Sequence, residues 1–405
     1  MYLLTLCWAC GSPTETRIVS EANGSYFDAQ RLDEDAPVSF DAFYEPQSVR
    51  DAGAGEVCPT GSIGGSVCAP NGDLLYGATI RAESEDCLGR PVVMEVTSDQ
   101  AGRFRIDGLP TTFTEVTIQS GVFVGRYGVD IEAGQVIGLT ESGTTKVCFP
   151  TNSAGLGVLQ GDYDKVENLI EELGFDHDVI CGGYGTHSAG QQLLLDSARL
   201  STFDILFVNC VSGIELRATN PEIETMKNNV RQFVRDGGSL YVSDLSSDFI
   251  AQLWPEVAVF DTTNPSSRSL DPCCLCSDCR DDCPIETIEL NACDEANELP
   301  PDCRSPSIPT GRGQTGELPA SVVSEFLRQS TGLDNLTVTF NGDNWVEIES
   351  VREDVEVLVQ SGTQPLMFLF QPYPGGGKVA YTSFHIHVQA TDPMKKLLRS
   401  LIFRL

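Results

Sequence analysis

The stretch NPEIETMKNNVRQFVRDGGSLYVSDLSSDF, residues 220–249, decides the fold. Asn220 suits a helix cap and Pro221 the first helical position, and apolar residues then recur at helical spacing. A glycine pair at 237–238 ends this helix. The next residues, Ser239–Val242, are short, apolar and β-prone, which predicts a strand covered on both faces. A sharp turn then leads into a second helix.

The same alternation extends to both sides of this stretch, from about residue 150 to the end of the chain. Strands are expected at Gly155–Gln160, Asp176–Cys181 and Phe203–Asn209. Strands that alternate with helices predict a flavodoxin-like α/β domain, with a parallel sheet and helices on both faces. Further on we expect a helix at Pro319–Gln329, a series of strands up to Lys378–Thr382, and a last helix. Asp392 is expected to cap that last helix.

Charge and length exclude several classes of function. The chain has 405 residues and a net charge of −32, so binding to nucleic acid or to an anionic membrane surface is not expected. No apolar run approaches the roughly 20 residues that span a bilayer. Residues 11–57 are rich in Ser, Glu, Asp, Ala and Pro and predict a flexible tether.

Fifteen cysteines indicate an oxidising compartment. The spacing of Cys273, Cys276, Cys279 and Cys283 also suits zinc, but in an exported protein disulfides are favoured, so no metal or cofactor is expected. Without Cys7 and Cys10 the number of cysteines is odd, and Cys210 is the candidate for the unpaired thiol. The disulfide candidates are Cys58, Cys68, Cys87, Cys148, Cys181, Cys273, Cys274, Cys276, Cys279, Cys283, Cys293 and Cys303.

The N-terminus, MYLLTLCWACGS, is an apolar segment that ends in Ala9-Cys10-Gly11-Ser12. It resembles the lipobox of bacterial lipoproteins, which implies cleavage before Cys10 and lipidation of its thiol. A basic region is absent, and Cys7 stands where leucine is usual, so an ordinary secretory signal or a hydrophobic strand remains an alternative. Residues 1–10 are thus predicted to direct export, to the cell surface, the periplasm or the extracellular space. The predicted membrane contact is the lipid alone.

Residues 58–145 predict a β-sandwich, because short β-prone runs alternate there with turn signals. Residues 99–110 read D-x-x-G-x-F-x-I-x-G-L-P, in which Phe104 and Ile106 are expected to point into the core. This pattern resembles the carboxypeptidase regulatory-like domain, an immunoglobulin-like seven-stranded sandwich sometimes grouped with carbohydrate-binding folds. The resemblance implies a spacer or adhesive module. Cys68 and Cys87 are expected to staple the domain, and Cys58 or Cys148 to tie its ends.

Residues 150–405, apart from a cysteine-rich insertion at 256–316, carry a second resemblance. The segments GDYDKVENLIEELG, FDILFVNC, VRQFVRDGGSLYVSD and GGGKVAYTSFHIHVQATDPMKKLLRSLIF resemble the class I glutamine amidotransferase-like fold in its ThuA-like branch. That family implies a cysteine nucleophile at the elbow after the central strand, and a late histidine. Here the elbow reads Val242-Ser243-Asp244-Leu245 without cysteine, whereas Phe384-His385 matches the histidine position.

A hydrolytic site at this elbow is the sharpest catalytic hypothesis. Ser243 would be the nucleophile and His385 its base, with Asp244 or Asp248 orienting the imidazole. The alternative is a relic elbow, in which Asp244 caps the next helix and His385 bonds to backbone groups. Serine nucleophiles usually sit between glycines that relieve crowding. Since Ser243 has neither glycine, the relic is favoured.

Other polar residues fall at predicted strand ends on the same edge of the sheet. Cys210 is expected to be a buried or disulfide-linked thiol rather than a nucleophile. His385 and His387 are two residues apart on a strand and point to opposite faces, so they do not chelate one metal. Asp162 and Asp164 suit the capping of a helix better than a cation site. The ligand-pocket candidates are Asp162, Asn209, Cys210, Ser243, Asp244 and His385.

The sequence as a whole predicts an exported protein with a tether, a β-sandwich and an amidotransferase-like domain that lacks the family's nucleophile. We therefore expect a non-enzymatic module for binding or display at the cell envelope, with a glycan or an envelope protein as partner. An extracellular hydrolase that uses Ser243 and His385 is one alternative, and a purely structural envelope component is another.

Overall fold

A computed structural model describes the chain in two compact units, a smaller one that ends at Ser153 and a larger one that begins at Ala154 and continues to Leu405. The described residues are 30–31, 58–139, 146–161, 163–182, 188–210, 214, 216–217, 219–263, 310–384 and 390–405. Several predictions fall outside them, namely those on the lipobox at residues 1–10, most of the tether, Asp162, the cysteines from 273 to 303, His385 and His387.

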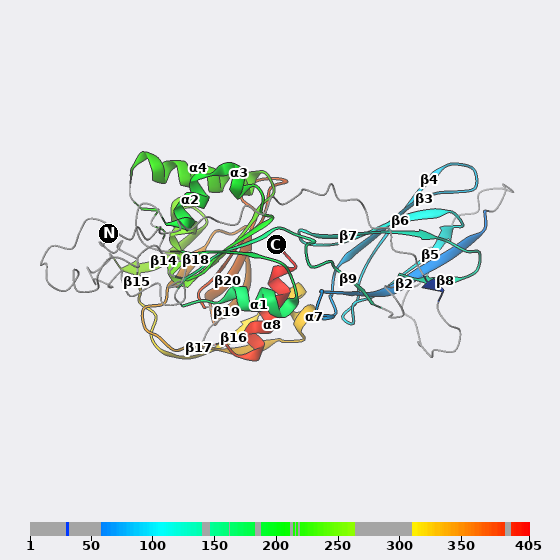
Figure 1. The fold of residues 1–405 in the computed structure, drawn as a ribbon. Helices are drawn as coiled ribbons and strands as arrows, with labels where there is room; N and C mark the ends of the chain where they lie inside the picture. Colours follow the sequence, from blue (N-terminus) through cyan, green and yellow to red (C-terminus); the bar gives the residue numbers. More distant parts are fainter. Residues whose placement is uncertain are drawn as a thin grey trace, which may run out of the picture. The chain divides into compact units, whose positions relative to one another are not determined.

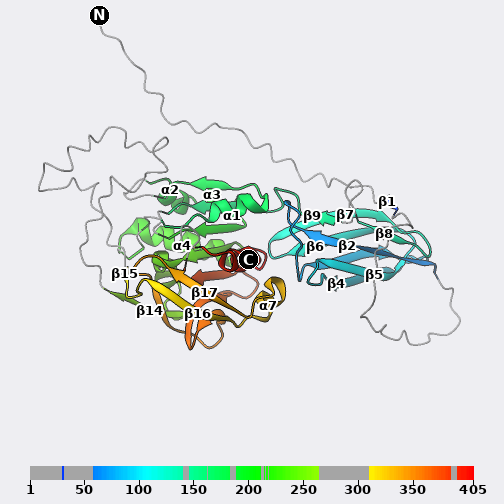
Figure 2. The same ribbon diagram turned by 90° about the horizontal axis from the view of Figure 1, so that it is seen from below.

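The smaller unit consists of two β-sheets (Figures 1 and 2). One has the strand order β1-β8-β2-β5, with β9 also pairing with β2, and the other has the order β4-β3-β6-β7. The strands are β1 (Gln30–Arg31), β2 (Thr60–Cys68), β3 (Thr79–Glu85), β4 (Pro91–Thr97), β5 (Arg103–Pro110), β6 (Phe113–Ser120), β7 (Phe123–Asp130), β8 (Val136–Gly138) and β9 (Lys146–Cys148).

Alternating side chains build the core of this unit. Phe104 and Ile106 on β5 are buried, as the sequence predicts. Gly102, at the turn before β5, has a φ of +69°, and a Cβ there would lie 2.7 Å from the carbonyl oxygen of Val67. The tight turn therefore requires glycine.

Two disulfides close the smaller unit, and their pairing differs from the expected one. Cys68 bonds to Cys148 and Cys58 bonds to Cys87. The reason is register, because β2 and β9 run in parallel with Cys68 directly beside Cys148. Cys87 lies instead in the exposed connection between β3 and β4, out of reach of the buried Cys68.

The larger unit is built on a nine-stranded sheet with the order β11-β10-β12-β13-β21-β20-β19-β16-β17. Its strands are β10 (Leu156–Leu159), β11 (Asp178–Ile180), β12 (Ile205–Val208), β13 (Ser239–Ser243), β16 (Gly316–Val322), β17 (Asn335–Phe340), β19 (Glu356–Ser361), β20 (Gln364–Phe370) and β21 (Val379–Thr382). The first five strands in this order are parallel, and the other four pair antiparallel. The prediction of a parallel sheet is thus right for one half only. Antiparallel neighbours need no crossover helix, so short connections suffice in the second half.

Helices cover both faces of the sheet, with α2, α3, α4 and α5 on one side and α1, α7 and α8 on the other (Figure 1). Their bounds are α1 (Val166–Leu173), α2 (Ala189–Leu195), α3 (Ser197–Leu200), α4 (Pro221–Arg235), α5 (Asp248–Leu253), α7 (Glu325–Thr331) and α8 (Asp392–Ile402). None of the described helices is long and apolar enough to cross a membrane.

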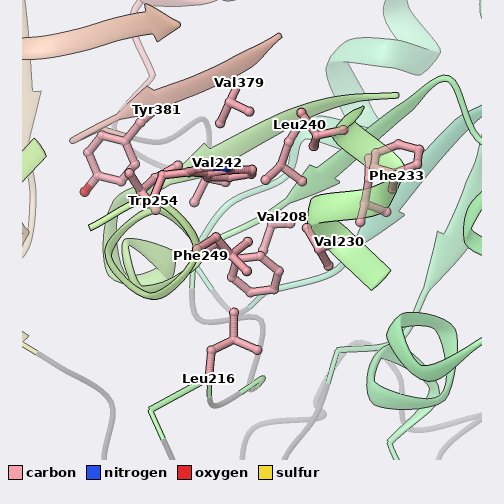
Figure 3. Close-up of a cluster of buried hydrophobic side chains, with 14 of the residues drawn as sticks. Val208, Leu216, Val230, Phe233, Leu240, Val242, Phe249, Trp254, Val379 and Tyr381 are labelled. Atoms are coloured by element: carbon pink, nitrogen blue, oxygen red, sulfur yellow. The ribbon is translucent and has the colours of Figure 1, made fainter. Parts of the chain in front are cut away.

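The deciding stretch folds as predicted. The Asn220 side chain accepts a hydrogen bond of 2.9 Å from the Ile223 amide, which caps α4. The buried face of α4 packs with α5 against β12, β13 and β21 (Figure 3). A Cβ on Gly377, before β21, would lie 2.0 Å from the carbonyl oxygen of Gly238, so the two strands begin in close contact. At α8 the cap is Thr391 rather than Asp392, which is already in the first turn.

The predicted helix at Pro319–Gln329 is right only from Glu325 onward. Its first part is strand β16, and helix α7 begins only at Glu325. Proline is tolerated in β16 because its pairing with β19 is confined to Ser321 and Val322, which leaves that side of the strand unpaired at Pro319. Figure 2 shows β16 and β17 with α7 nearby.

The ends of the predicted insertion at 256–316 are ordered strands rather than loop. Strand β14 (Ala258–Thr263) pairs with β15 (Thr310–Gly311) and with β18 (Glu347–Val351) in a three-stranded sheet. Thr263 lies directly opposite Thr310. The chain between them therefore leaves and rejoins the fold at one place.

We expect the two disulfides of the smaller unit to differ in their contribution to stability. In the chain-entropy treatment, a longer closed loop restricts the unfolded chain more. The sequence separations of 80 and 29 residues predict that replacing Cys68 and Cys148 by alanine costs about 1 kcal/mol more free energy of unfolding than replacing Cys58 and Cys87. Urea unfolding of both double variants measures the difference. Equal losses would contradict this expectation.

Candidate functional site

Polar residues gather at the carboxyl ends of the parallel strands. Along the chain β10 is followed by β11 on one side of it and by β12 on the other, so the strand order reverses at β10. Ligand sites of open α/β sheets form beyond the strand ends at such a reversal. Asp164 follows β10, Asn209 and Cys210 follow β12, and Ser243 and Asp244 stand at the end of β13.

Ser243 is completely buried and already hydrogen-bonded. Its hydroxyl donates a hydrogen bond of 2.6 Å to Oδ2 of Asp164. Oδ1 of Asp164 accepts a hydrogen bond of 2.9 Å from the backbone amide of Lys165, the residue before α1. The proton of the candidate nucleophile is thus directed at a carboxylate on a neighbouring element. Sequence reasoning placed Asp164 at a helix start but missed this partner, which is 79 residues away in the chain.

The sharp turn itself falls on Asp244. Its φ of +41° is in the left-handed region that side chains other than glycine rarely adopt. Oδ1 accepts a hydrogen bond of 2.7 Å from the Val346 amide, and Oδ2 accepts one of 3.6 Å from the thiol of Cys210. Its carbonyl oxygen accepts a third, of 2.9 Å, from the Tyr381 hydroxyl. Asp244 therefore joins three elements, and its carboxylate does not cap the following helix as expected.

Asn209 connects the end of β12 with α1. Its Nδ2 donates hydrogen bonds to Oε2 of Glu167 at 2.8 Å and to the carbonyl oxygen of Asp164 at 3.3 Å. The Asn209 carbonyl accepts a hydrogen bond of 2.8 Å from the Ser246 hydroxyl. Within the described part of the chain, Oδ1 of Asn209 is buried without a hydrogen-bond partner. These contacts turn the strand ends into one continuous polar network.

Burial and neighbouring carboxylates raise the pKa of one thiol and two phenols at this network. Burial raises the pKa of the Cys210 thiol well above its usual value, and Asp244 and Asp164 raise it further. Burial likewise raises the pKa of Tyr241 and of Tyr381, with Asp164 the next cause for Tyr241 and Asp244 for Tyr381. A protonated thiol is a poor nucleophile. Cys210 is buried and free, as the sequence predicts.

The remaining candidates separate into two groups. Asp162 and His385 lie outside the described residues, so the pairing of Ser243 with His385 stays a prediction. Asp248 is described, and its carboxylate accepts a hydrogen bond of 2.8 Å from Nε of Arg217. Burial raises the pKa of Asp248, while Arg217 acts in the opposite direction. Among the described residues, no three His, Cys, Asp or Glu side chains are grouped so as to hold a metal ion.

Comparison with known proteins gives neighbours among solved structures only. No protein family and no curated protein matches the sequence. A cytoplasmic protein from Salmonella typhimurium is 12% identical with a TM-score of 0.35, and the match covers 62% of this chain and 98% of that one. A glutamine amidotransferase from Thermotoga maritima is 13% identical with a TM-score of 0.33, over 62% and 96% of the two chains. The predicted amidotransferase-like domain is consistent with such neighbours, but likeness at these TM-scores carries no conclusion about activity.

Substitutions of Asp244 test how its hydrogen bonds and its left-handed backbone conformation affect stability. Asp244→Ala loses two hydrogen bonds to the carboxylate and keeps the unfavourable φ, so we expect it to lose several kcal/mol of unfolding free energy. Asp244→Gly loses the same bonds without the strain and should be about 1 kcal/mol more stable than the alanine variant. Asp244→Asn keeps an acceptor for Val346 and should lose least. Chemical denaturation gives the order, and an alanine variant as stable as the glycine variant would speak against strain at this residue.

The raised pKa values predict a loss of stability in alkaline solution. The folded state raises the pKa of Cys210, Tyr241 and Tyr381. The protonated groups therefore contribute fully to the free energy of unfolding while the pH stays below the pKa of each group in the unfolded chain. This contribution to the free energy of unfolding is lost as the pH rises toward the pKa of the folded group, by up to about 1.4 kcal/mol per pH unit for each group. We expect Cys210→Ala to make this fall shallower. Urea unfolding from pH 7 to pH 10.5 measures the slope.

Val208→Ala is the matched control for that experiment. Val208 is fully buried on the strand before Cys210 but does not titrate. It should lower stability at every pH and keep the slope of the parent protein. A Cys210→Ala slope equal to that of the parent would refute the assignment of this loss to the thiol.

Proposed function

We propose that this protein is a non-enzymatic binding module exported to the cell envelope, in which the elbow of the α/β domain has a structural role. The observation that carries the proposal is the state of Ser243, which is fully buried with its hydroxyl bonded to Asp164. A nucleophile must be reachable by the substrate and adjacent to an oxyanion-binding site. A fully buried hydroxyl does not meet the first of these needs.

The surroundings of the elbow support the same reading. Asp244 occupies the turn where the amidotransferase family has its cysteine, and both of its carboxylate oxygens accept hydrogen bonds. Among the described cysteines, Cys210 lies beside Asp244, and burial and two carboxylates raise the pKa of its thiol well above the usual value. Each group with nucleophilic chemistry among the described strand ends is thus engaged in holding elements together.

Export is supported by covalent chemistry. Two disulfides in the smaller unit fit an extracellular location, since such bonds persist in oxidising compartments. The predicted tether is interrupted at Gln30–Arg31, which form strand β1 and pair with β8. In this proposal Cys10 carries the lipid anchor, the rest of residues 11–57 form the tether, and the smaller unit is a carboxypeptidase regulatory-like sandwich of immunoglobulin type. The smaller unit has one five-stranded and one four-stranded sheet, and Phe104 and Ile106 are buried in its core. Both features are compatible with that assignment.

The exposed face of the β4-β3-β6-β7 sheet is the proposed binding surface. Strand register places Glu83 between Val93 and Glu115, and Phe113 beside Asp130. Val93 and Phe113 are about half exposed, at 53% and 50%. Sugar sites usually offer several aromatic rings, whereas Phe113 is the one ring among the exposed side chains of these four strands. The carboxylates of the face outnumber its cations: Glu83, Glu85, Glu95, Glu115 and Asp130 stand against Arg126 and Arg81, which pairs with Glu83 at 2.6 Å. Charge complementarity therefore favours an envelope protein with a basic surface over a glycan.

A binding experiment tests this surface. Immobilised mature protein is incubated with envelope preparations of the source organism, treated either with protease or with periodate, which oxidises the diols of glycans. We expect protease to abolish binding, periodate to spare it, and added salt to weaken it. Loss of binding after periodate would transfer the function to a glycan, and no binding in any sample would favour a purely structural component.

Charge reversal locates the surface. Glu83→Lys combined with Glu115→Lys should weaken binding roughly tenfold, because two carboxylates at the centre of the face are inverted. The matched control is Glu317→Lys with Glu349→Lys, which changes the net charge equally on exposed residues of the larger unit. Equal losses in both variants would show a general charge effect and refute the proposed face.

Catalysis is tested separately. We expect the protein to hydrolyse a panel of esters and amides no faster than its Ser243→Ala variant. Hydrolysis by the parent protein that disappears in Ser243→Ala would establish the hydrolase with Ser243 and His385 instead.

A further inference from the structure

Strand β17 is the last strand of the nine-stranded sheet, so only one of its two edges is paired. It pairs with β16 in continuous antiparallel register, and Ser321 lies opposite Asn335. The Val322 amide donates a hydrogen bond of 2.9 Å to the carbonyl oxygen of Asp334, directly beside this pair. The Ser321–Asn335 pair is therefore of the non-hydrogen-bonded type, in which the backbone groups of Asn335 point away from β16.

Alternation extends this orientation along the strand. In an antiparallel ladder every second residue directs its N–H and C=O groups to the same side. The backbone groups of Asn335, Thr337 and Thr339 thus face the open edge. Pro319 agrees with this assignment, because it lies opposite Thr337 and has no amide hydrogen to donate. Among the described residues, the three amides and three carbonyl oxygens at this edge have no backbone hydrogen-bond partner.

The other sheet edges in the described part of the chain are protected against pairing. Strands β1 and β15 have two residues each, and β9 and β11 have three. Strands β5 and β7 contain charged residues, β18 contains two glutamates, and β4 begins with proline and contains Glu95. Short length, charge and proline each discourage strand addition. Strand β17, with the sequence NLTVTF, has six residues and contains no charge, proline, glycine or bulge.

We propose that the open edge of β17 binds an extended segment of a partner protein, which adds one strand to the sheet. In this mode of binding, main-chain hydrogen bonds supply affinity and alternate side chains supply specificity. Thr337 is exposed on one face of β17, whereas Leu336 and Val338 are buried on the other. The segment that fits has an uncharged centre rich in β-branched residues, since such side chains pair well with threonine and valine across strands.

Charge defines the ends of the bound segment. Asp334 precedes β17 and Asp343 follows it, and both residues are exposed. Residues 313–323, which include β16, and residues 332–351 contain no lysine or arginine. A partner segment with lysine or arginine at both ends therefore complements this edge. A second copy of the chain does not, because pairing two β17 strands brings acidic ends together in a protein of net charge −32.

Synthetic peptides test the proposal on the full-length protein. The probe KRTVTVTRK has basic ends and a β-branched centre. KRTPTPTRK keeps its charge but lacks two amide donors, and EDTVTVTDE keeps the centre and reverses the charge. Fluorescence anisotropy should show binding of the probe that weakens with salt, and binding at least about tenfold weaker for the other two peptides. No binding of the probe would overturn the inference, and so would equal binding of the proline peptide.

Amide hydrogen exchange locates the bound probe residue by residue. In the free protein, the amides of Asn335, Thr337 and Thr339 should exchange fast, whereas those of Leu336 and Val338, which face β16, should exchange slowly. Saturating KRTVTVTRK should slow the first three amides by about tenfold or more. Slow exchange of these three without peptide would show that the chain covers its own edge. That result, or protection on another surface only, would refute the proposal.

Two variants of one residue separate the backbone from the side chain. Thr337→Pro removes an outward amide while keeping the hydrogen bonds to β16, and it should weaken binding of the probe about tenfold or more. Thr337→Ala is the matched control, which keeps the amide and should bind almost as well as the parent protein. Undiminished binding by the proline variant, or an equal loss in both variants, would contradict strand addition. The probe is a purified peptide, so these results do not depend on the envelope-binding face proposed for β4-β3-β6-β7.

Discussion

A strand buried on both faces ends most favourably where its last polar groups find partners, and this constraint governs the end of β13 at the carboxyl edge of the large sheet. Strand β13 is buried from Ser239 to Ser243, and the chain must then reverse direction without solvent. Asp164 accepts a hydrogen bond from the Ser243 hydroxyl. Asp244 accepts hydrogen bonds from the Val346 amide, the Cys210 thiol and the Tyr381 hydroxyl. An unpaired polar group at this depth would cost about 1–3 kcal/mol, so the network is a condition for the fold.

The same network fixes the turn after β13. In an active elbow, a positive φ lifts the reactive side chain toward the substrate. Here the φ of +41° at Asp244 turns a carboxylate toward three neighbouring elements of the protein. The geometry of the turn is therefore maintained by contacts within the protein.

Much of this architecture could be predicted from local patterns. Helix α4, with its cap Asn220, and the strands β10, β12 and β13 follow from apolar spacing and glycine stops. Register and pairing could not be predicted, because they depend on residues distant in sequence. Strand β16 was mistaken for the start of a helix, since nothing local to Pro319 reveals that one side of the strand lacks a neighbour. The partners Cys68 and Cys148 depend on the register of β2 and β9 for the same reason.

At the candidate site, too, the positions of residues could be predicted from local patterns, whereas their hydrogen-bond partners could not. Asn209, Cys210, Ser243 and Asp244 stand at the ends of predicted strands. The carboxyl ends of parallel strands meet at one edge of the sheet, so these residues were expected to lie together there. The bond between Ser243 and Asp164, which decides whether the hydroxyl is available, links two turns that no sequence pattern connects.

The direct pairing of Thr263 with Thr310 has a consequence for protein engineering. Two neighbouring residues of adjacent antiparallel strands are the ideal joints for exchanging a module, because any sequence whose ends meet can be grafted there without moving the sheet. A two-residue β-turn or an entire reporter domain should be equally compatible with β14 and β15.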